Sequence, residues 1–326
     1  MELKGLKLPG LVVNHLKGDP DEVRANGWLE WDGSVDLDAA IIGIPFDGAS
    51  TVRTGSRHGP DAVRSALAYY TTWSSDARFS MSDLRAADIG DIDVVVTDMA
   101  GTFARVKSVI QDLVAGGVVP ISIGGDHSIA WPILEGITAA RTGRRVGVVH
   151  FDAHHDLREA HFGAESSGVP FRKALEFPDD AVAGRNLVQI GMTEFCNSSI
   201  HADYAEQMGV TVIPGLQVRR DGIDSVIDIA LERAGDGTDG IYVSVDIDCI
   251  DQSQAPGTAA PNPCGMDGRD LQHALRRLAR DPRVLGCDIV EISPPLDINN
   301  MTGNLGAMMV LNFLMGLAMR GAGQGA

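Results

Sequence analysis

Two clusters of acidic and imidazole side chains each follow an apolar run that is rich in β-branched residues. Residues 152–156 (DAHHD) come directly after VGVVHF, and residues 246–248 (DID) come directly after IYVSV. Charged groups at the ends of buried strands are costly unless something neutralises them, and a metal ion does so most simply. The motif GGDHS, at residues 124–128, adds the imidazole of His127. We therefore expect these segments to form a metal site.

The candidate donors are oxygens and nitrogens, with no thiolate among them. They are His127, Asp152, His154, Asp156, Asp246 and Asp248. Such a set fits a pair of Mn²⁺ ions better than a cysteine-built zinc site, and paired ions imply a metal-activated water and hydrolysis. In an extended segment Asp246 and Asp248 share a face, where they repel unless a cation lies between them or one is protonated. Each segment also has an alternative interpretation. Asp246 and Asp248 could be solvated acids at a strand end, residues 152–156 could form an exposed polar loop, and His127 could be a structural histidine after two glycines.

The composition argues against several classes of partner. With 27 basic and 44 acidic residues among 326, the formal net charge of −17 disfavours binding to nucleic acids and anionic membranes. The N-terminus lacks an apolar signal region, and the longest apolar stretch, residues 307–319, is interrupted by Asn312 and too short to span a bilayer. Widely spaced cysteines without a CxxC pair are typical of reduced thiols: Cys196, Cys249, Cys264 and Cys287. We expect a cytoplasmic protein.

Short apolar runs alternate with longer helical patterns, which is typical of a mainly parallel sheet covered on both faces. The runs predict strands at residues 39–45, 118–123, 146–151, 187–190, 210–213, 241–246 and 285–291, with a weaker eighth at 86–92. The helical patterns predict helices at residues 60–69, 98–115, 128–138, 199–207, 223–233, 268–280 and 304–320. No linker separates two regimes of composition, so we expect one domain over residues 1–326, with an N-terminal arm to about residue 35 and a core over about 36–320.

Unusual polar residues lie in four loops that follow predicted strands. These loops are residues 124–128, 152–156, 246–255 and 291–297. In open α/β sheets, sites lie in the crevice beyond the carboxyl ends of the strands. We therefore expect the four loops to converge there.

Taken together, the motifs resemble the ureohydrolase superfamily, which contains the arginases and agmatinases. The resemblance covers about residues 39–315 and rests on GGDHS at 124–128, FDAHHD at 151–156, SVDIDCID at 244–251, APGT at 255–258, the loop 48–64, and Glu291 in DIVEISPPLD. It implies a three-layer α/β/α fold with about eight strands, two Mn²⁺ ions per subunit, and a homotrimer or homohexamer. One ion would be held by His127, Asp152, Asp156 and Asp246, and the other by Asp152, His154, Asp246 and Asp248. Glu291 would receive substrate N–H groups, unless it is only an acid at a strand end.

The chain departs from the arginase and agmatinase pattern at one position. Ser167 stands where those enzymes carry a histidine that is thought to shuttle protons, and a hydroxyl is not an acid at neutral pH. His155 or His161 would then supply the proton, unless the leaving group needs less help. The candidate catalytic residues are therefore Asp156, Glu291, His155 and His161.

Within the superfamily, residues 154–171, Asp251-Gln252 and residues 260–263 resemble formimidoylglutamases. This resemblance implies hydrolysis of N-formimidoyl-L-glutamate to L-glutamate and formamide, in histidine breakdown. Arg158 would favour a dicarboxylate substrate through bidentate pairing and oppose the ammonium end of agmatine, unless it pairs with Glu159, Glu165 or another acid. Ser167 and Asn197 are further candidates for substrate contact, although Asn197 is equally suited to a turn. The alternative functions are an agmatinase-like or guanidino-acid hydrolase that releases urea, and a metal-binding but inactive homologue.

Overall fold

The structure is a computed structural model that describes residues 22–33, 36–141, 143–160 and 165–320. Most of the predicted N-terminal arm and the candidate catalytic residue His161 lie outside these described residues.

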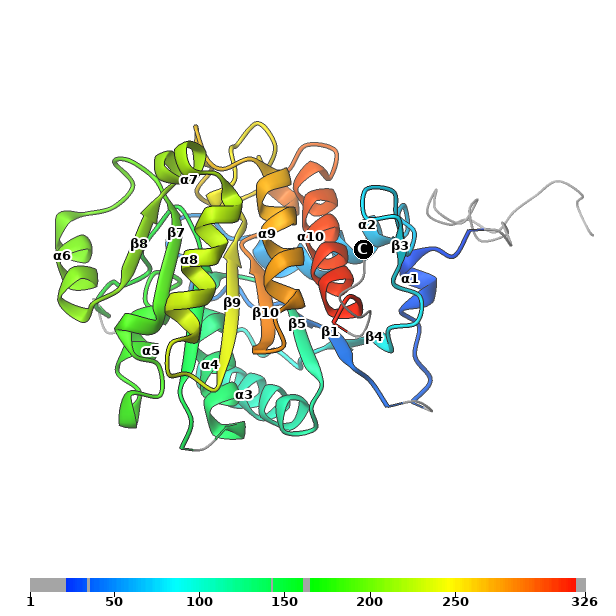
Figure 1. Cartoon of the computed structure of the whole chain (residues 1–326), viewed down its shortest axis with the longest axis horizontal. Coiled ribbons are helices and arrows are strands. Elements are labelled where there is room, and N and C mark those ends of the chain that lie inside the picture. The colour runs from blue at the N-terminus through cyan, green and yellow to red at the C-terminus, as the bar shows by residue number, and fades with distance from the viewer. Residues whose placement is uncertain (1–21, 34–35, 142, 161–164, 321–326) are drawn as a thin grey trace, which may run out of the picture.

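A parallel sheet of eight strands forms the centre of the molecule (Figure 1). Its order is β4 (Ala86–Asp91), β1 (Ala39–Ile44), β5 (Val119–Gly124), β10 (Val284–Val290), β9 (Gly240–Asp246), β6 (Val146–Phe151), β7 (Leu187–Met192) and β8 (Thr211–Pro214). Each of the eight predicted strands is present, with ends shifted by at most two residues. The prediction of a mainly parallel, eight-stranded α/β fold is confirmed.

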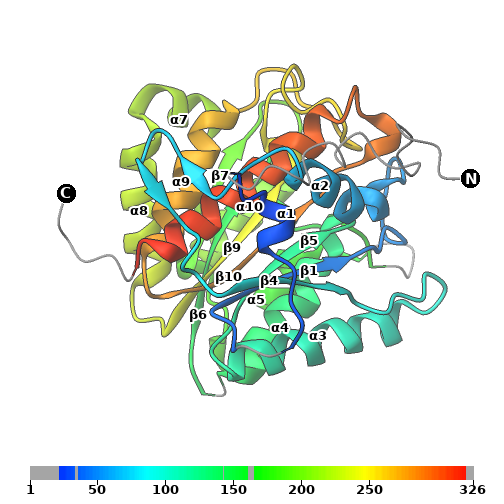
Figure 2. The same ribbon diagram turned by 90° about the vertical axis from the view of Figure 1, so that its right-hand side faces the viewer.

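Helices cover both faces of the sheet. One face packs against α2 (Gly59–Leu67), α8 (Ile223–Gly235), α9 (Gly268–Arg280) and α10 (Met301–Ala318), and the other against α3 (Met99–Ala115), α4 (Ala130–Ala140) and α5 (Pro170–Leu175). Figures 1 and 2 show α9 and α10 on one side and α3 and α4 on the other. This double cover explains why β1, β6, β7, β9 and β10 are buried at every position and read as continuous apolar runs.

The seven predicted helices are present as α2, α3, α4, α6 (Ser199–Met208), α8, α9 and α10, with ends within three residues of the predictions. Shorter elements escaped prediction: α1 (Ala25–Trp28), α5, α7 (Gly215–Asp221), and the hairpin β2 (Trp73–Ser74) and β3 (Phe79–Ser80). Each spans at most two helical turns or two residue pairs, which is too short for a periodic pattern to emerge.

Helix α10 is long and apolar enough to cross a membrane by composition, yet 72% of it is buried inside the protein. It packs against α9 and α2. Its polar residue Asn312 is satisfied there, because Asn312 Oδ1 accepts hydrogen bonds from Arg276 Nε and Nη2 at 3.0 and 2.6 Å. These contacts place α10 in the core of the protein.

The strand order explains why the four polar loops meet. Strands β5, β10, β9 and β6 are consecutive in the sheet, and all four run in the same direction. The loops that follow them therefore leave the same edge side by side. The register pairs Val290 with Asp246 and Phe151 with Val245, so the acidic clusters after β6 and β9 are direct neighbours.

Candidate metal centre

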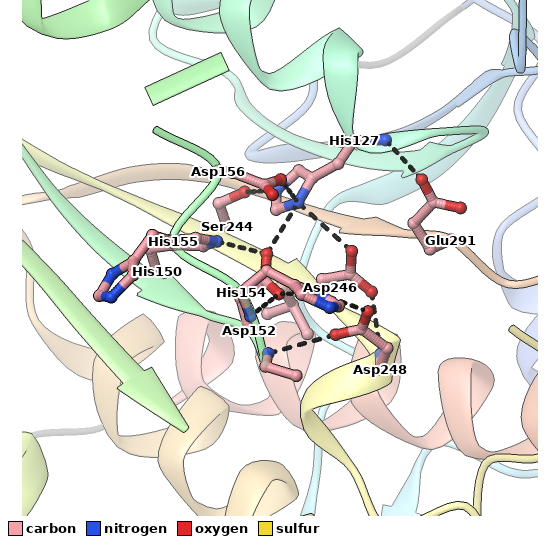
Figure 3. Close-up of polar contacts among 12 residues, drawn as sticks. His127, His150, Asp152, His154, His155, Asp156, Ser244, Asp246, Asp248 and Glu291 are labelled. Carbon is pink, nitrogen blue, oxygen red and sulfur yellow. Dashed lines mark hydrogen bonds and ion pairs between the residues drawn. The ribbon is translucent and has the colours of Figure 1, made fainter. Parts of the chain in front are cut away.

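The six predicted ligands and Glu291 gather at the carboxyl edge of the sheet (Figure 3). His127 begins a short 3₁₀ helix after β5, the residues of the DAHHD segment follow β6, Asp246 ends β9, and Glu291 follows β10. Most of these side chains are buried, and His154 is the one that is partly exposed. The predicted convergence of the four loops is therefore what the structure shows.

The two imidazoles lie on either side of Asp152. His127 Nδ1 is 3.1 Å from Asp152 Oδ2, 3.0 Å from Asp156 Oδ2 and 3.4 Å from Asp246 Oδ2. His154 Nδ1 is 3.3 Å from Asp152 Oδ1 and 3.1 Å from Asp248 Oδ2. Asp152 thus turns one oxygen toward each histidine, the arrangement that a carboxylate shared by two cations requires.

Backbone hydrogen bonds hold the carboxylates in place. Asp152 Oδ1 accepts from His154 N at 2.6 Å, and Asp246 Oδ1 accepts from Asp248 N at 2.9 Å. Each aspartate therefore closes a turn on the amide two residues later, as aspartates at strand ends commonly do. Asp248 Oδ1 in turn accepts from Ala153 N at 3.2 Å and ties the two acidic loops together. In both motifs, the spacing of two residues allows the aspartate to close this turn and also places alternate side chains on the same face.

A buried chain of hydrogen bonds sets the tautomer of His127. Ser244 Oγ donates to Asp288 Oδ1 at 2.8 Å, so it accepts from His127 Nε2, which is 2.9 Å away. Asp288 is held by the Tyr242 hydroxyl and by Val245 N, the latter at 3.1 Å. In the neutral imidazole that would bind a metal, His127 Nδ1 therefore carries the lone pair, and in that form it has no hydrogen-bond donor among the described residues. A buried lone pair ringed by carboxylates fits a cation.

His150, inside strand β6, is a residue that the sequence analysis missed. It lies with His127 and Asp152 in a group whose donor atoms are within 4.8 Å of one another, which is close enough for a metal ligand. However, His150 Nε2 donates to Asp152 Oδ2 at 2.8 Å, and its Nδ1 accepts from Gln189 Nε2 at 3.1 Å. Both ring nitrogens are engaged, so His150 orients Asp152. The available signal was a histidine within an otherwise apolar strand.

Without a cation, the carboxylates attract protons. Burial disfavours the charged form of His127, but the hydrogen bonds that a protonated Nδ1 makes to Asp152, Asp156 and Asp246 outweigh burial and raise its pKa well above the usual range. Burial and the charges of Asp248 and Asp152 raise the pKa of Asp246 well above its usual value.

The second half of the centre behaves in the same way. Burial and the charge of Asp152 raise the pKa of Asp248 to about 6. Burial lowers the pKa of His154, but Asp248 and Asp152 outweigh burial and raise it. The centre thus concentrates negative charge that a divalent ion would neutralise.

A cleft opens above these groups. Five of the predicted ligands line it: His127, His154, Asp156, Asp246 and Asp248. The loop after β1 forms one wall with Ser50, Thr51 and Val52, and the loop after β9 forms another with Thr258, Ala259 and Ala260. The remaining lining residues are Arg158, Ser167, Gly168 and Glu291. Glu291 Oε1 accepts from His127 N at 3.1 Å, whereas its buried Oε2 has no partner within the described part of the chain. Burial and the charges of Asp246 and Asp126 raise the pKa of Glu291 well above its usual value.

Arg158 contributes positive charge to the cleft. The two acids that the sequence offered as its partners pair elsewhere: Glu159 with Arg172 at 2.9 Å and Glu165 with Lys173 at 3.0 Å. Arg158 forms no ion pair with any described residue. Its stem lies against Gly168, where a Cβ would come within 2.8 Å of Arg158 Cδ, so a larger residue at 168 would displace it. The guanidinium is thus available to a ligand in the cleft.

The other candidate residues divide between the cleft and its supports. Ser167 lines the cleft, and its backbone N–H donates to Ala49 O at 3.0 Å. His155 does not line it, because His155 Nδ1 donates to Gln189 Oε1 at 2.6 Å. Asn197 instead holds the backbone of the DAHHD loop: its Oδ1 accepts from His155 N at 2.9 Å, and its Nδ2 donates to Ala153 O at 2.8 Å. The sequence offered no sign of this supporting role.

Comparison with known proteins agrees with this geometry. Residues 37–316 match the model of the arginase family. The chain belongs to the arginase family. It is 37% identical over 295 residues to a formimidoylglutamase of Halalkalibacterium halodurans, covering 90% of this chain and 91% of that one. It is 34% identical over 285 residues to a guanidinopropionase of Pseudomonas aeruginosa, covering 86% and 87% of the two chains.

Solved structures of the family share the fold. The formimidoylglutamase of Bacillus subtilis has a TM-score of 0.88 and 30% identity, covering 98% of this chain and 97% of that one. A Trypanosoma cruzi formiminoglutamase solved with Mn²⁺ has a TM-score of 0.86 and 25% identity, covering 92% of this chain and all of that one. The predicted superfamily is confirmed, and the protein is a hydrolase of C–N bonds in linear amidines.

Proposed function

We propose that this arginase-family protein hydrolyses N-formimidoyl-L-glutamate to L-glutamate and formamide, using two Mn²⁺ ions bound in the cleft. The observation that carries the proposal is the guanidinium of Arg158, which forms no ion pair with any described residue and lines a cleft floored by the predicted ligands. The 37% identity to a formimidoylglutamase also supports the proposal.

The donor set fits two ions. His127, Asp152, Asp156 and Asp246 would hold one ion, and Asp152, His154, Asp246 and Asp248 the other. Two observations support this division: His127 Nδ1 faces the carboxylates of Asp152, Asp156 and Asp246, and Asp152 turns one oxygen toward each histidine. The Mn²⁺ ions found in the related Trypanosoma cruzi structure support the choice of metal. When bound, such ions polarise the amidine and lower the pKa of a water molecule.

The protein's own residues would bind and orient the substrate. The free Oε2 of Glu291 would accept N–H groups of the amidine, and a charge-assisted bond of this kind also fixes the orientation. Arg158 would pair with a substrate carboxylate. Asp156, with Oδ2 toward His127, also lines the cleft and would accept a proton from water there. Ser167 would donate a hydrogen bond but not act as an acid at neutral pH. Because His155 is bound to Gln189 and does not line the cleft, we assign the proton donor to the leaving amine to His161, which lies outside the described residues.

A guanidino-acid hydrolase is the second candidate function. The 34% identity to a guanidinopropionase supports it, and a guanidino acid also carries a carboxylate for Arg158. Agmatine fits less well, because its ammonium group would face the same guanidinium.

One substrate panel separates these functions. Mn²⁺-loaded protein and an EDTA-treated control are incubated with formimidoylglutamate, 3-guanidinopropionate, 4-guanidinobutyrate, arginine and agmatine, and formamide, urea and ammonia are measured separately. Formamide and glutamate from the first substrate are the expected products. If the protein releases urea from a guanidino acid and no formamide from formimidoylglutamate, formimidoylglutamate is not its substrate. The assignment to the arginase family would still hold. Full metal loading without turnover on any of them would indicate the inactive homologue.

We further propose a cytoplasmic homo-oligomer, a trimer or hexamer as the family resemblance implies. Light scattering on the purified protein tests this directly, and a monomeric mass would refute it.

A further inference from the structure

We propose that Gln189 keeps His150 out of the metal centre by holding its imidazole in a single tautomer, and that it thereby sets the preference of the centre for Mn²⁺ over Zn²⁺. This inference rests on the proposed metal centre and deepens it. Gln189 lies in the middle of β7, fully buried, and is not one of the candidate ligands.

The sheet register brings the two residues together. His150 in β6 and Gln189 in β7 are directly paired across the parallel strands. Gln189 Nε2 donates to His150 Nδ1 at 3.1 Å and to His155 O at 2.7 Å, and Gln189 Oε1 accepts from His155 Nδ1 at 2.6 Å. The oxygen and the nitrogen of this amide are thus both engaged.

These bonds allow one orientation of the amide. A carbonyl oxygen can only accept, so the amide nitrogen must face His155 O and cannot exchange places with Oε1. Because the same nitrogen donates to His150 Nδ1, that atom carries the lone pair, and the proton of His150 lies on Nε2. There it is donated to Asp152 Oδ2 at 2.8 Å. His155, which does not line the cleft, therefore acts as the residue that orients Gln189.

The consequence concerns the choice of metal. His150, His127 and Asp152 place donor atoms within 4.8 Å of one another. If His150 turned a lone pair toward Asp152, it would add a second imidazole on the His127 side of the centre. Nitrogen-rich sites favour Zn²⁺, whereas oxygen-rich sites suit Mn²⁺. The proton on Nε2 prevents this and leaves the centre oxygen-rich.

The test compares metal affinities of the full-length protein. Gln189→Leu keeps the approximate volume but can neither donate nor accept, so His150 is free to change tautomer. Mn²⁺ and Zn²⁺ dissociation constants are measured by calorimetry with a competing chelator. We expect the ratio of Mn²⁺ to Zn²⁺ affinity to fall by about tenfold or more, the size typical of changes around metal ligands. A ratio equal to that of the wild type would overturn the proposal.

A matched control is Asn186→Leu. Asn186 is buried just before β7, and its amide donates to Arg233 O at 2.9 Å and Asp236 O at 2.8 Å, so its loss also removes buried hydrogen bonds. If this variant is only destabilised, its affinities for Mn²⁺ and Zn²⁺ should fall by the same factor. The ratio of the two affinities should then match that of the wild type. In the double variant Gln189→Leu/His150→Leu, the ratio should return toward the wild-type value. A shift that persists without His150 would overturn the mechanism.

Two further readings separate the possible failures. If Gln189→Leu does not fold, ¹⁵N NMR of the wild-type histidine side chains decides, because the proposal requires a neutral His150 with its proton on Nε2, and a proton on Nδ1 would refute it. If the wild type binds no Mn²⁺ at all, the proposed function fails. If the wild type binds Mn²⁺ and Gln189→Leu keeps its selectivity, only the role of Gln189 fails.

Discussion

Replacing Ser244 with alanine should weaken Mn²⁺ binding without touching a metal ligand. Ser244 Oγ accepts from His127 Nε2 at 2.9 Å and donates to Asp288 Oδ1 at 2.8 Å, and it is fully buried. In Ser244→Ala the Nε2–H loses its acceptor. His127 can then move its proton to Nδ1, where it faces the carboxylates of Asp152 and Asp156 and blocks the lone pair that a metal needs.

The size of the effect follows from the buried bond. Leaving a buried donor without a partner costs about 1–3 kcal/mol, and changes around a metal ligand typically cost about 10–100-fold in affinity, which is about 1.4–2.8 kcal/mol. We therefore expect the Mn²⁺ dissociation constant to rise by about 10–100-fold. Isothermal titration calorimetry on the EDTA-treated, dialysed protein measures this directly.

Ser122→Ala supplies the matched control. Ser122 and Ser244 flank Asp288 on neighbouring strands in register, and both are fully buried, but Ser122 Oγ has no hydrogen-bond partner among the described residues. Ser122→Ala should leave the Mn²⁺ affinity unchanged. If Ser244→Ala also binds Mn²⁺ with wild-type affinity, the assignment of His127 Nδ1 as a metal ligand is wrong.

Three further predictions concern the charges of the site. Asp246→Asn should abolish turnover, yet raise the stability of the metal-free protein at pH 7. The raised pKa of Asp246 marks a carboxylate whose ionisation opposes folding at that pH. Urea unfolding in EDTA measures the stability, and a variant less stable than the wild type would contradict this prediction. The raised pKa values of His127 and His154 lie above the unfolded value of about 6.5, so the protons are held in the metal-free fold and must leave when metal binds. Mn²⁺ affinity should therefore rise from about pH 6 to 8, and Mn²⁺ binding should release protons. Calorimetry in buffers of different ionisation enthalpy measures the number of protons released, and a value of zero would disprove the prediction. Arg158→Met should raise KM for formimidoylglutamate by about tenfold or more, the worth of a charged hydrogen bond. It should lower KM for agmatine, because the ammonium group of agmatine would no longer face a guanidinium. Equal effects on both substrates would remove Arg158 from carboxylate recognition.

The sequence was informative where one residue type at one spacing has few physical explanations. Buried acids after apolar strands predicted the metal loops, and the alternation of runs and helices predicted the parallel sheet. Because parallel strands end at the same edge, the convergence of His127, Asp152 and Asp246 followed from those two patterns. The strand order β5–β10–β9–β6 makes the loops neighbours. This order cannot be predicted from the sequence pattern of any single segment.

The supports of the site could not be predicted in the same way. Ser244, Gln189 and Asp288 act through partners on adjacent strands, and the pairing of strands is known only from the fold. Asn197 is a similar case, because its bonds to the DAHHD loop span more than forty residues of chain. Arg158 was named from the sequence, but its freedom from Glu159 and Glu165 depended on where Arg172 and Lys173 lie.

Anomalous diffraction from crystals of the Mn²⁺-loaded protein tests the central claim most directly. The structure predicts two manganese peaks on the floor of the cleft, one between His127 and Asp152 and the other between Asp152 and His154. A single peak, or manganese bound only elsewhere on the protein, would contradict the account.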